Sequence, residues 1–153
     1  MSRKPTASDA QLILQLYDLR REAEMRKARN WWLVNFWPMT ADEFLKVATG
    51  LGTEENAWFR QVAGYWDMAA SLVLHGILHP DLFLEGGSSG EMVFLFAKIQ
   101  PILKEVRKKM QAPGLFLNVE KVITGSKTGR DRLKIIGARV QARRKAMAEG
   151  KAK

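Results

Sequence analysis

Apolar residues recur along nearly the whole chain at the three- and four-residue spacing that places side chains on one face of an α-helix. Leu and Ala are the commonest residues, with 17 of each, and both are strong helix formers. No segment shows the alternation of apolar and polar residues that is typical of a half-buried strand, and no Asn-Gly or Asp-Gly pair marks a hairpin. The spacing therefore predicts an all-α fold, an irregular orthogonal bundle of five or six helices.

Glycines, prolines and capping residues divide this helical pattern into segments. Ser8 and Gln11 have the spacing of a capping box, which predicts a first helix over about residues 9–36. Pro101 predicts a kink or a break in the fourth helix, because proline cannot donate the backbone hydrogen bond of a helix interior. The other expected helices cover about residues 41–49, 54–75, 92–110, 115–124 and 130–148. A short flexible loop is expected at 85–90, and a loop that forms a tight turn between helices at 125–129.

The length of 153 residues is that of one domain with a real hydrophobic core. Within it we expect a flexible arm over residues 1–8, a helical domain over residues 9–128, and a basic helix and tail over residues 129–153. The longest apolar stretches are far shorter than the roughly 20 residues of a membrane-spanning helix. Because the first residues also lack the apolar core of a secretory signal, we expect a cytoplasmic protein.

Several classes of reactive site are excluded or not expected. The chain has no cysteine, which excludes disulfides, a thiol nucleophile and zinc sites built on thiolates. His75 and His79 are four residues apart, but Gly76 interrupts their helix and no third ligand lies close in sequence. We therefore expect no metal, no cofactor and no assembled set of catalytic residues.

A row of polar residues interrupts the apolar pattern of the helix expected at 54–75. Arg60, Asp67, Ser71 and His75 lie at spacings of seven, four and four, which places them on one face. One interpretation is a small polar site in which Asp67 accepts a proton, Arg60 holds an anion and His75 titrates. The other is an ordinary helix face with an Arg–Asp contact and a histidine near the negative end of the helix dipole.

The end of the chain carries most of the positive charge. Residues 130–153 hold nine Lys and Arg and two acids, a net charge of +7, whereas residues 1–129 hold sixteen and fourteen, a net charge of +2. On a helical wheel Leu133, Ile136, Val140 and Met147 form an apolar arc. The candidate residues for binding phosphate or a partner flank that arc: Arg130, Lys134, Arg139, Arg143, Arg144 and Lys145. This helix can dock on the body, pair with a second copy, bind phosphates, or serve only as a solubilising tail.

A further set of segments lies in the middle of the chain: Phe59-Arg60-Gln61-Val62, Tyr65-Trp66-Asp67-Met68-Ala69-Ala70-Ser71-Leu72-Val73, Gly76-Ile77-Leu78, Leu82-Phe83 and Ile99-Gln100-Pro101-Ile102. With these segments the chain resembles a group of small, all-helical bacterial proteins of unknown function. The resemblance covers about residues 55–110 and less clearly residues 9–37. It implies a helical fold and a bacterial source, and it assigns no activity and no catalytic residue.

Three functions are compatible with these observations. The first is a non-enzymatic module that binds a protein partner or itself, plausibly as a homodimer. The second is nucleic-acid binding without sequence recognition, through the phosphate contacts of residues 130–153. The third is a small enzyme or ligand-binding protein with a polar site around Asp67.

Overall fold

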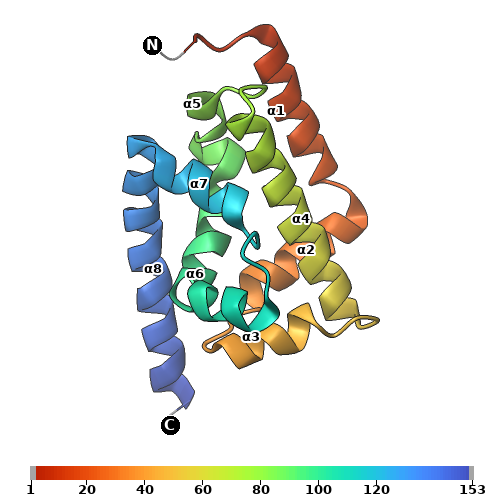
Figure 1. Ribbon diagram of the computed structural model, residues 1–153, viewed down its shortest axis with the longest axis vertical. Coiled ribbons are helices and arrows are strands. Elements are labelled where there is room, and N and C mark those ends of the chain that lie inside the picture. The colour runs from red at the N-terminus through yellow and green to blue at the C-terminus, as the bar shows by residue number, and fades with distance from the viewer. Residues whose placement is uncertain (1–2, 152–153) are drawn as a thin grey trace.

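A computed structural model describes residues 3–151 of the chain, and over that range it is all-helical, as predicted (Figure 1). Within residues 3–151, eight helices replace the five or six that the sequence predicts. They are α1 (Ala7–Leu19), α2 (Ala23–Val34), α3 (Ala41–Ala48), α4 (Glu54–Leu74), α5 (Pro80–Phe83), α6 (Gly86–Met110), α7 (Leu117–Gly125) and α8 (Lys127–Lys151). None of the helices in the described part of the chain has both the length and the apolar composition that crossing a bilayer requires.

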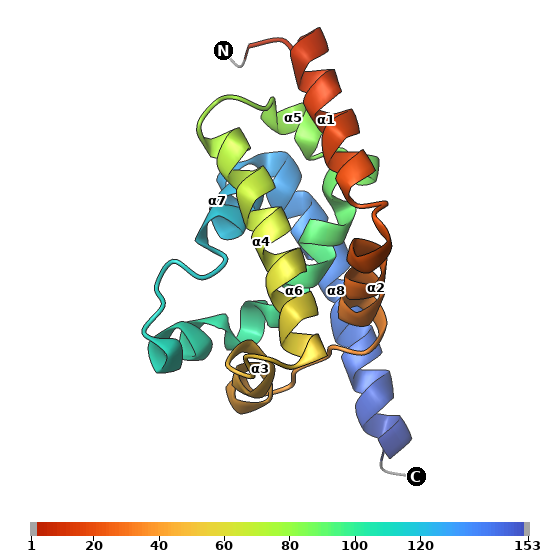
Figure 2. The same ribbon diagram turned by 90° about the vertical axis from the view of Figure 1, so that its right-hand side faces the viewer.

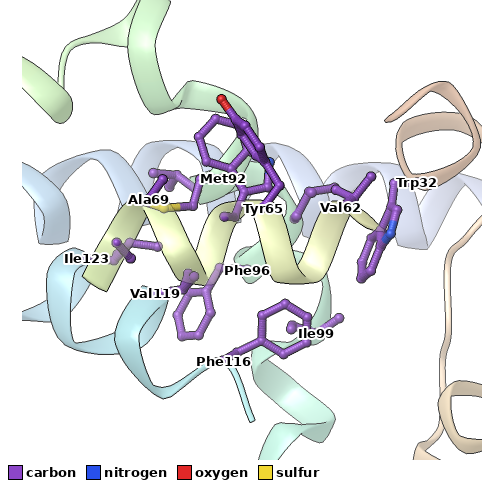
Figure 3. Close-up of a cluster of buried hydrophobic side chains, with 14 of the residues drawn as sticks. Trp32, Val62, Tyr65, Ala69, Met92, Phe96, Ile99, Phe116, Val119 and Ile123 are labelled. Carbon is purple, nitrogen blue, oxygen red and sulfur yellow. The ribbon is translucent and has the colours of Figure 1, made fainter. Parts of the chain in front are cut away.

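The core is built around α4, which runs through the middle of the bundle between α2, α3 and α7 (Figures 1 and 2). Val62 and Ala69 of α4 are fully buried, and Figure 3 shows them among side chains from α6 and α7. Near one end of α4 the Trp32 ring stacks on Phe59, with 5.4 Å between the ring centroids. Large aromatic rings thus fill the space where α2 and α4 meet.

The helix predicted over residues 9–36 is two helices, with a break between Leu19 and Ala23. The Glu22 side chain accepts hydrogen bonds from the backbone amides of Glu24 and Met25, so a new helix begins there. The N-cap of α1 is Thr6 in a capping box with Asp9, and not Ser8 with Gln11. The break between α1 and α2 and the N-cap of α1 both differ from the prediction for one reason. Several residues in these segments can cap a helix, and the neighbouring structure decides which one does.

Residues 3–6, in the segment predicted to be a flexible arm, contact the body. The Arg3 guanidinium donates to both carboxylate oxygens of Asp9, at 2.6 Å each, and to the Ile77 carbonyl. This guanidinium, with hydrogen bonds from Thr6 and from the His79 backbone amide, holds the pKa of Asp9 well below its usual range. Residues 3–6 are therefore fastened to the turn that follows α4, and residues 1 and 2 of the predicted arm lie outside the described residues.

The loop predicted at residues 85–90 is the first part of α6. Glu85 precedes the helix and its carbonyl accepts from the Ser88 and Ser89 amides, while the Ser89 side chain is fully buried. Packing at this point outweighs the low helix propensity of glycine and serine. Pro101 lies inside α6, and the helix changes direction along its length (Figure 2).

The last helix, α8, begins at Lys127, directly after the single connecting residue Ser126. The predicted loop at 125–129 is thus reduced to one residue. The helix packs along α6 and α7 on the side of the molecule opposite α1, and its last turns extend past the other helices (Figures 1 and 2). Its position decides which of its charges face outward.

Candidate functional site

The apolar arc of α8 faces the body of the protein. Val140 is fully buried, and Leu133, Ile136 and Met147 are half-buried. Leu133 and Ile136 pack against the main core cluster. The helix is therefore held by hydrophobic contact along one face, and its other faces remain exposed to solvent.

Arg144 lies on the buried side of α8 and not on its exposed flank, which separates it from the other candidate phosphate-binding residues. It is 7% exposed, and its guanidinium donates to the carbonyl oxygens of Pro38 and Lys98. This guanidinium therefore connects α8 to α6 and to the segment between α2 and α3. On the helical wheel it follows Val140 by one turn, so the same face that buries the valine buries the arginine.

Lys98 is a second buried cation, and the sequence analysis did not select it. Its ammonium donates to the Trp32 carbonyl and lies 4.3 Å from the centroid of the Trp37 ring and 5.4 Å from that of Phe94. Burial, with a further contribution from the Arg144 charge, lowers the pKa of Lys98 to about 7. One sequence signal was available, because Lys98 is the only charge in the apolar run from Met92 to Ile99.

The remaining five candidate cations of α8 are exposed. They are Arg130, Lys134, Arg139, Arg143 and Lys145. None forms an ion pair with any residue in the described range, although Arg130 donates to the Thr124 carbonyl at 2.7 Å. Helical geometry places Arg139 and Arg143 on one flank and the other three on the opposite flank. Between the two flanks lies an exposed strip that includes Ile135, Ala138 and Ala142.

Cations elsewhere in the molecule are more often paired. Arg29 contacts Glu91 at 2.7 Å, Arg107 contacts Glu120 at 2.7 Å, and Lys109 contacts Asp42 at 2.7 Å. In α8 the only ion pair among described residues joins Lys127 to Asp131. The exposed flanks of α8 thus carry five cations that have no ion-pair partner among the described residues.

A groove of about 470 Å³ runs between α6 and α8. Arg130 and Lys134, one helical turn apart, lie on its border, and Pro101 and Gly137 are among the residues that line it. Neither Pro101 nor Gly137 carries a long side chain that would fill the space. Two cations that border the same hollow form a suitable position for one phosphate group.

The polar row of α4 does not assemble into one site. Arg60 donates from Nε to the Asn56 side chain at 3.0 Å, and the Ser71 hydroxyl donates to the Met68 carbonyl at 2.7 Å. The His75 ring contacts the Ser71 carbonyl at 2.8 Å. These three side chains therefore bind within α4 itself.

Asp67 has a different partner, contributed by α7. The Asn118 amide donates to its Oδ2 atom at 2.8 Å. The sequence analysis missed Asn118, because 51 residues separate it from Asp67 and no local pattern connects them. Over the described residues, no group of three or more His, Cys, Asp or Glu side chains is arranged to hold a metal ion.

Comparison with known proteins identifies a family but no activity. A family model described as a domain of unknown function (DUF4760) matches residues 5–126. This match spans α1 to α7 and ends one residue before α8 begins. No curated protein and no solved structure matches the chain. The resemblance to a family of unknown function is thereby confirmed.

Proposed function

Since this chain belongs to the DUF4760 family of unknown function, its role has to be inferred from its own side chains, and we propose that it binds duplex nucleic acid through α8. The binding is to phosphates and does not depend on base sequence. The observation that carries this proposal is the set of five exposed α8 cations with no ion-pair partner among the described residues.

The shape of α8 suits a groove of a duplex. A major groove about 12 Å wide admits one α-helix. At Ala138 and Ala142 the exposed strip has short side chains, so this part of the helix can approach the floor of the groove closely. The cations of the two flanks then extend toward the two phosphate backbones. The exposed surface of α8 has no aromatic side chain, which disfavours a binding mode that depends on base stacking.

The test measures binding of a fluorescent duplex of about 20 base pairs by anisotropy, between about 50 and 200 mM salt. If all five cations contact phosphates, log K falls with log salt with a slope of about −4.5. The variant Lys134→Gln/Arg139→Gln/Arg143→Gln/Lys145→Gln is expected to lower affinity at least ~100-fold at low salt, because four counterion-releasing contacts are lost. Substitution is preferred to truncation because Val140 and Arg144 of α8 complete the core.

A matched control separates a local site from net charge. Lys46, Lys104, Lys108 and Lys121 are exposed cations on α3, α6 and α7. Changing these four to Gln lowers the net charge from +9 to +5, as the α8 variant does. We expect the control to keep most of its affinity and its salt slope. Equal losses in the two variants, or no binding by the wild-type protein at low salt, would contradict the proposal.

A second candidate function is association with a protein partner or with a second copy. It is supported by α1, which exposes Leu14 and Tyr17, three residues apart on one face, by 67% and 52% respectively. An apolar group of this kind on a peripheral helix favours an interface. A dimer in light scattering that Leu14→Asn/Tyr17→Asn converts to a monomer would support self-association. A wild-type monomer at every concentration would exclude it.

A further inference from the structure

A small pocket opens between α4 and the connection from α6 to α7. Its volume is about 350 Å³, which lies within the range of small-molecule sites. Ala63, Gly64 and Asp67 line it from α4, and Ala112, Gly114 and Leu115 line it from the connection. The lining is therefore apolar except for one carboxylate.

That carboxylate is only partly satisfied. Its Oδ2 atom accepts the Asn118 hydrogen bond, whereas its Oδ1 atom is buried and has no hydrogen-bond partner. No cation of the described chain lies within ion-pair distance of Asp67. A carboxylate with one oxygen lacking a donor and no cation nearby is incompletely stabilised, so a cationic ligand in the pocket that Asp67 lines would stabilise its charge.

The pocket is held open by the fold. Arg107 donates from Nε to the Leu115 carbonyl at 2.9 Å, and it pairs with Glu120 of α7 at 2.7 Å. These contacts fix the connection at a distance from α4. A Cβ atom added at Gly64 or at Gly114 would meet no other atom within 4 Å, so both glycines leave usable space.

The same connection is strained at both ends. Gln111 has a φ angle of 53° and Phe116 has a φ angle of 55°, in the left-handed region that non-glycine residues rarely adopt. For a bulky residue such as Phe116 this conformation has an energetic cost, and such costs concentrate at ligand sites. The strain is thus a second, independent feature of the pocket wall.

We propose that this pocket binds a small organic ammonium ion with an apolar body. The ammonium pairs with the Asp67 carboxylate, which lines the pocket, and the apolar body contacts the walls from α4 and the connection. A divalent metal is disfavoured because Mg²⁺ and Ca²⁺ require several oxygen ligands, and the lining offers one carboxylate. This site is separate from α8, and it does not depend on nucleic-acid binding.

The test uses benzylammonium chloride as the probe and follows backbone amide shifts of the full chain by NMR. We expect saturable shifts at residues 63–67 and 112–118. Benzyl alcohol, which has a similar shape but no charge, is expected to bind at least about tenfold more weakly, because a hydrogen bond to a charged group is lost. Benzoate is expected not to bind. Equal affinities for benzylammonium and benzyl alcohol would overturn the proposal, as would an absence of shifts in these segments.

Two variants, each with a matched control, test the lining residues directly, and the first removes the charge of the carboxylate. Asp67→Asn keeps an oxygen that can accept from Asn118 but removes the charge, and it is expected to weaken benzylammonium binding at least about tenfold. Asp81→Asn makes the same charge change at an exposed position of α5 and should leave binding unchanged. Unchanged affinity in Asp67→Asn would refute the role of the carboxylate.

The second variant fills the pocket. Gly64→Leu places a side chain in the open space and is expected to abolish the shifts, whereas Gly150→Leu, at an exposed and open position of α8, should not change them. The amide spectrum of each unliganded variant reports whether it is folded. If a folded Gly64→Leu protein bound benzylammonium as the wild type does, the ligand would lie elsewhere.

Discussion

The Lys98 ammonium is enclosed by aromatic rings, and it has no acidic partner among the described residues. The surroundings of Lys98 therefore disfavour its protonated form, because the one charged side chain of the described residues that acts on it is the Arg144 guanidinium. A buried amine in such surroundings releases its proton more easily than an amine in water. The ionisation of this single residue consequently contributes to the pH dependence of folding.

We predict that the free energy of unfolding rises with pH between about pH 7 and about pH 10. In that range the unfolded chain keeps a proton on Lys98 that the folded protein has released, so the gain approaches about 1.4 kcal/mol per pH unit. Lys98→Met is expected to flatten this slope in urea titrations, and the exposed Lys104→Met should retain it. Equal slopes in both variants would contradict the assignment. Above that range Tyr65, whose pKa is raised to about 12 by burial, acts in the opposite direction.

Sequence reasoning placed the candidate residues on faces but did not find their partners. The row from Arg60 to His75 does lie along α4 and its C-cap residue, yet Asp67 is hydrogen-bonded to a residue of α7 that no spacing rule connects to it. Likewise the wheel of the last helix separated its apolar arc from its cations. The wheel could not decide whether Arg144 lies on the buried or on the exposed side of α8. That depends on where α6 and the residues before α3 contact the helix.

Among the elements, the junction of α7 and α8 depends on a close approach of two backbones. A single residue separates the helices, and a Cβ atom at Gly129 would collide with the Ile123 backbone. In contrast, a Cβ atom at Gly137 of the same helix would meet nothing within 4 Å. Glycine is thus required at the first position and optional at the second.

Gly129→Ala is therefore expected to lower the free energy of unfolding by about 1 to 3 kcal/mol, because α7 and α8 have to move apart. Gly137→Ala serves as the matched variant and should be neutral or stabilising by up to ~1 kcal/mol, since alanine is the better helix former. Chemical denaturation of the two variants measures both changes. A wild-type midpoint for Gly129→Ala would show that the junction adjusts without cost.

Helices with strong boundary signals were predicted well, and those with weak signals were not. The starts of α3 and α4, expected at residues 41 and 54, lie directly after Thr40 and Thr53, whose side chains cap the helices. The break after α1 contains neither glycine nor proline, so periodicity alone runs through it. Conversely, the Gly- and Ser-rich start of α6 has the composition of a loop and becomes helical because Ser89 is enclosed by the fold.

For the molecule as a whole, Arg144 connects parts that are far apart in sequence. Its hydrogen bonds join α8 to Lys98 in α6 and to Pro38 between α2 and α3. These contacts fasten the distal half of α8, while Ser126 fastens its beginning through the chain itself. The orientation of the exposed cations depends on both attachments.

We expect Arg144→Met to cost about 2 to 4 kcal/mol of unfolding free energy, because buried carbonyl groups lose a charged donor. Hydrogen exchange is expected to accelerate over residues 138–150 more than over α4. Arg143→Met, which changes the exposed neighbour, should alter neither quantity. Uniform acceleration across all helices would instead indicate that α8 opens only with the rest of the protein.

The attachment of α8 at its beginning and again at Arg144 has a thermodynamic consequence for the proposed contact with polyanions. Basic segments that fold only on contact bury new apolar surface at that moment, and calorimetry then records a large negative change in heat capacity. Here the apolar arc of the helix is already buried before any partner arrives. Titration calorimetry at several temperatures should therefore give binding enthalpies that change little with temperature.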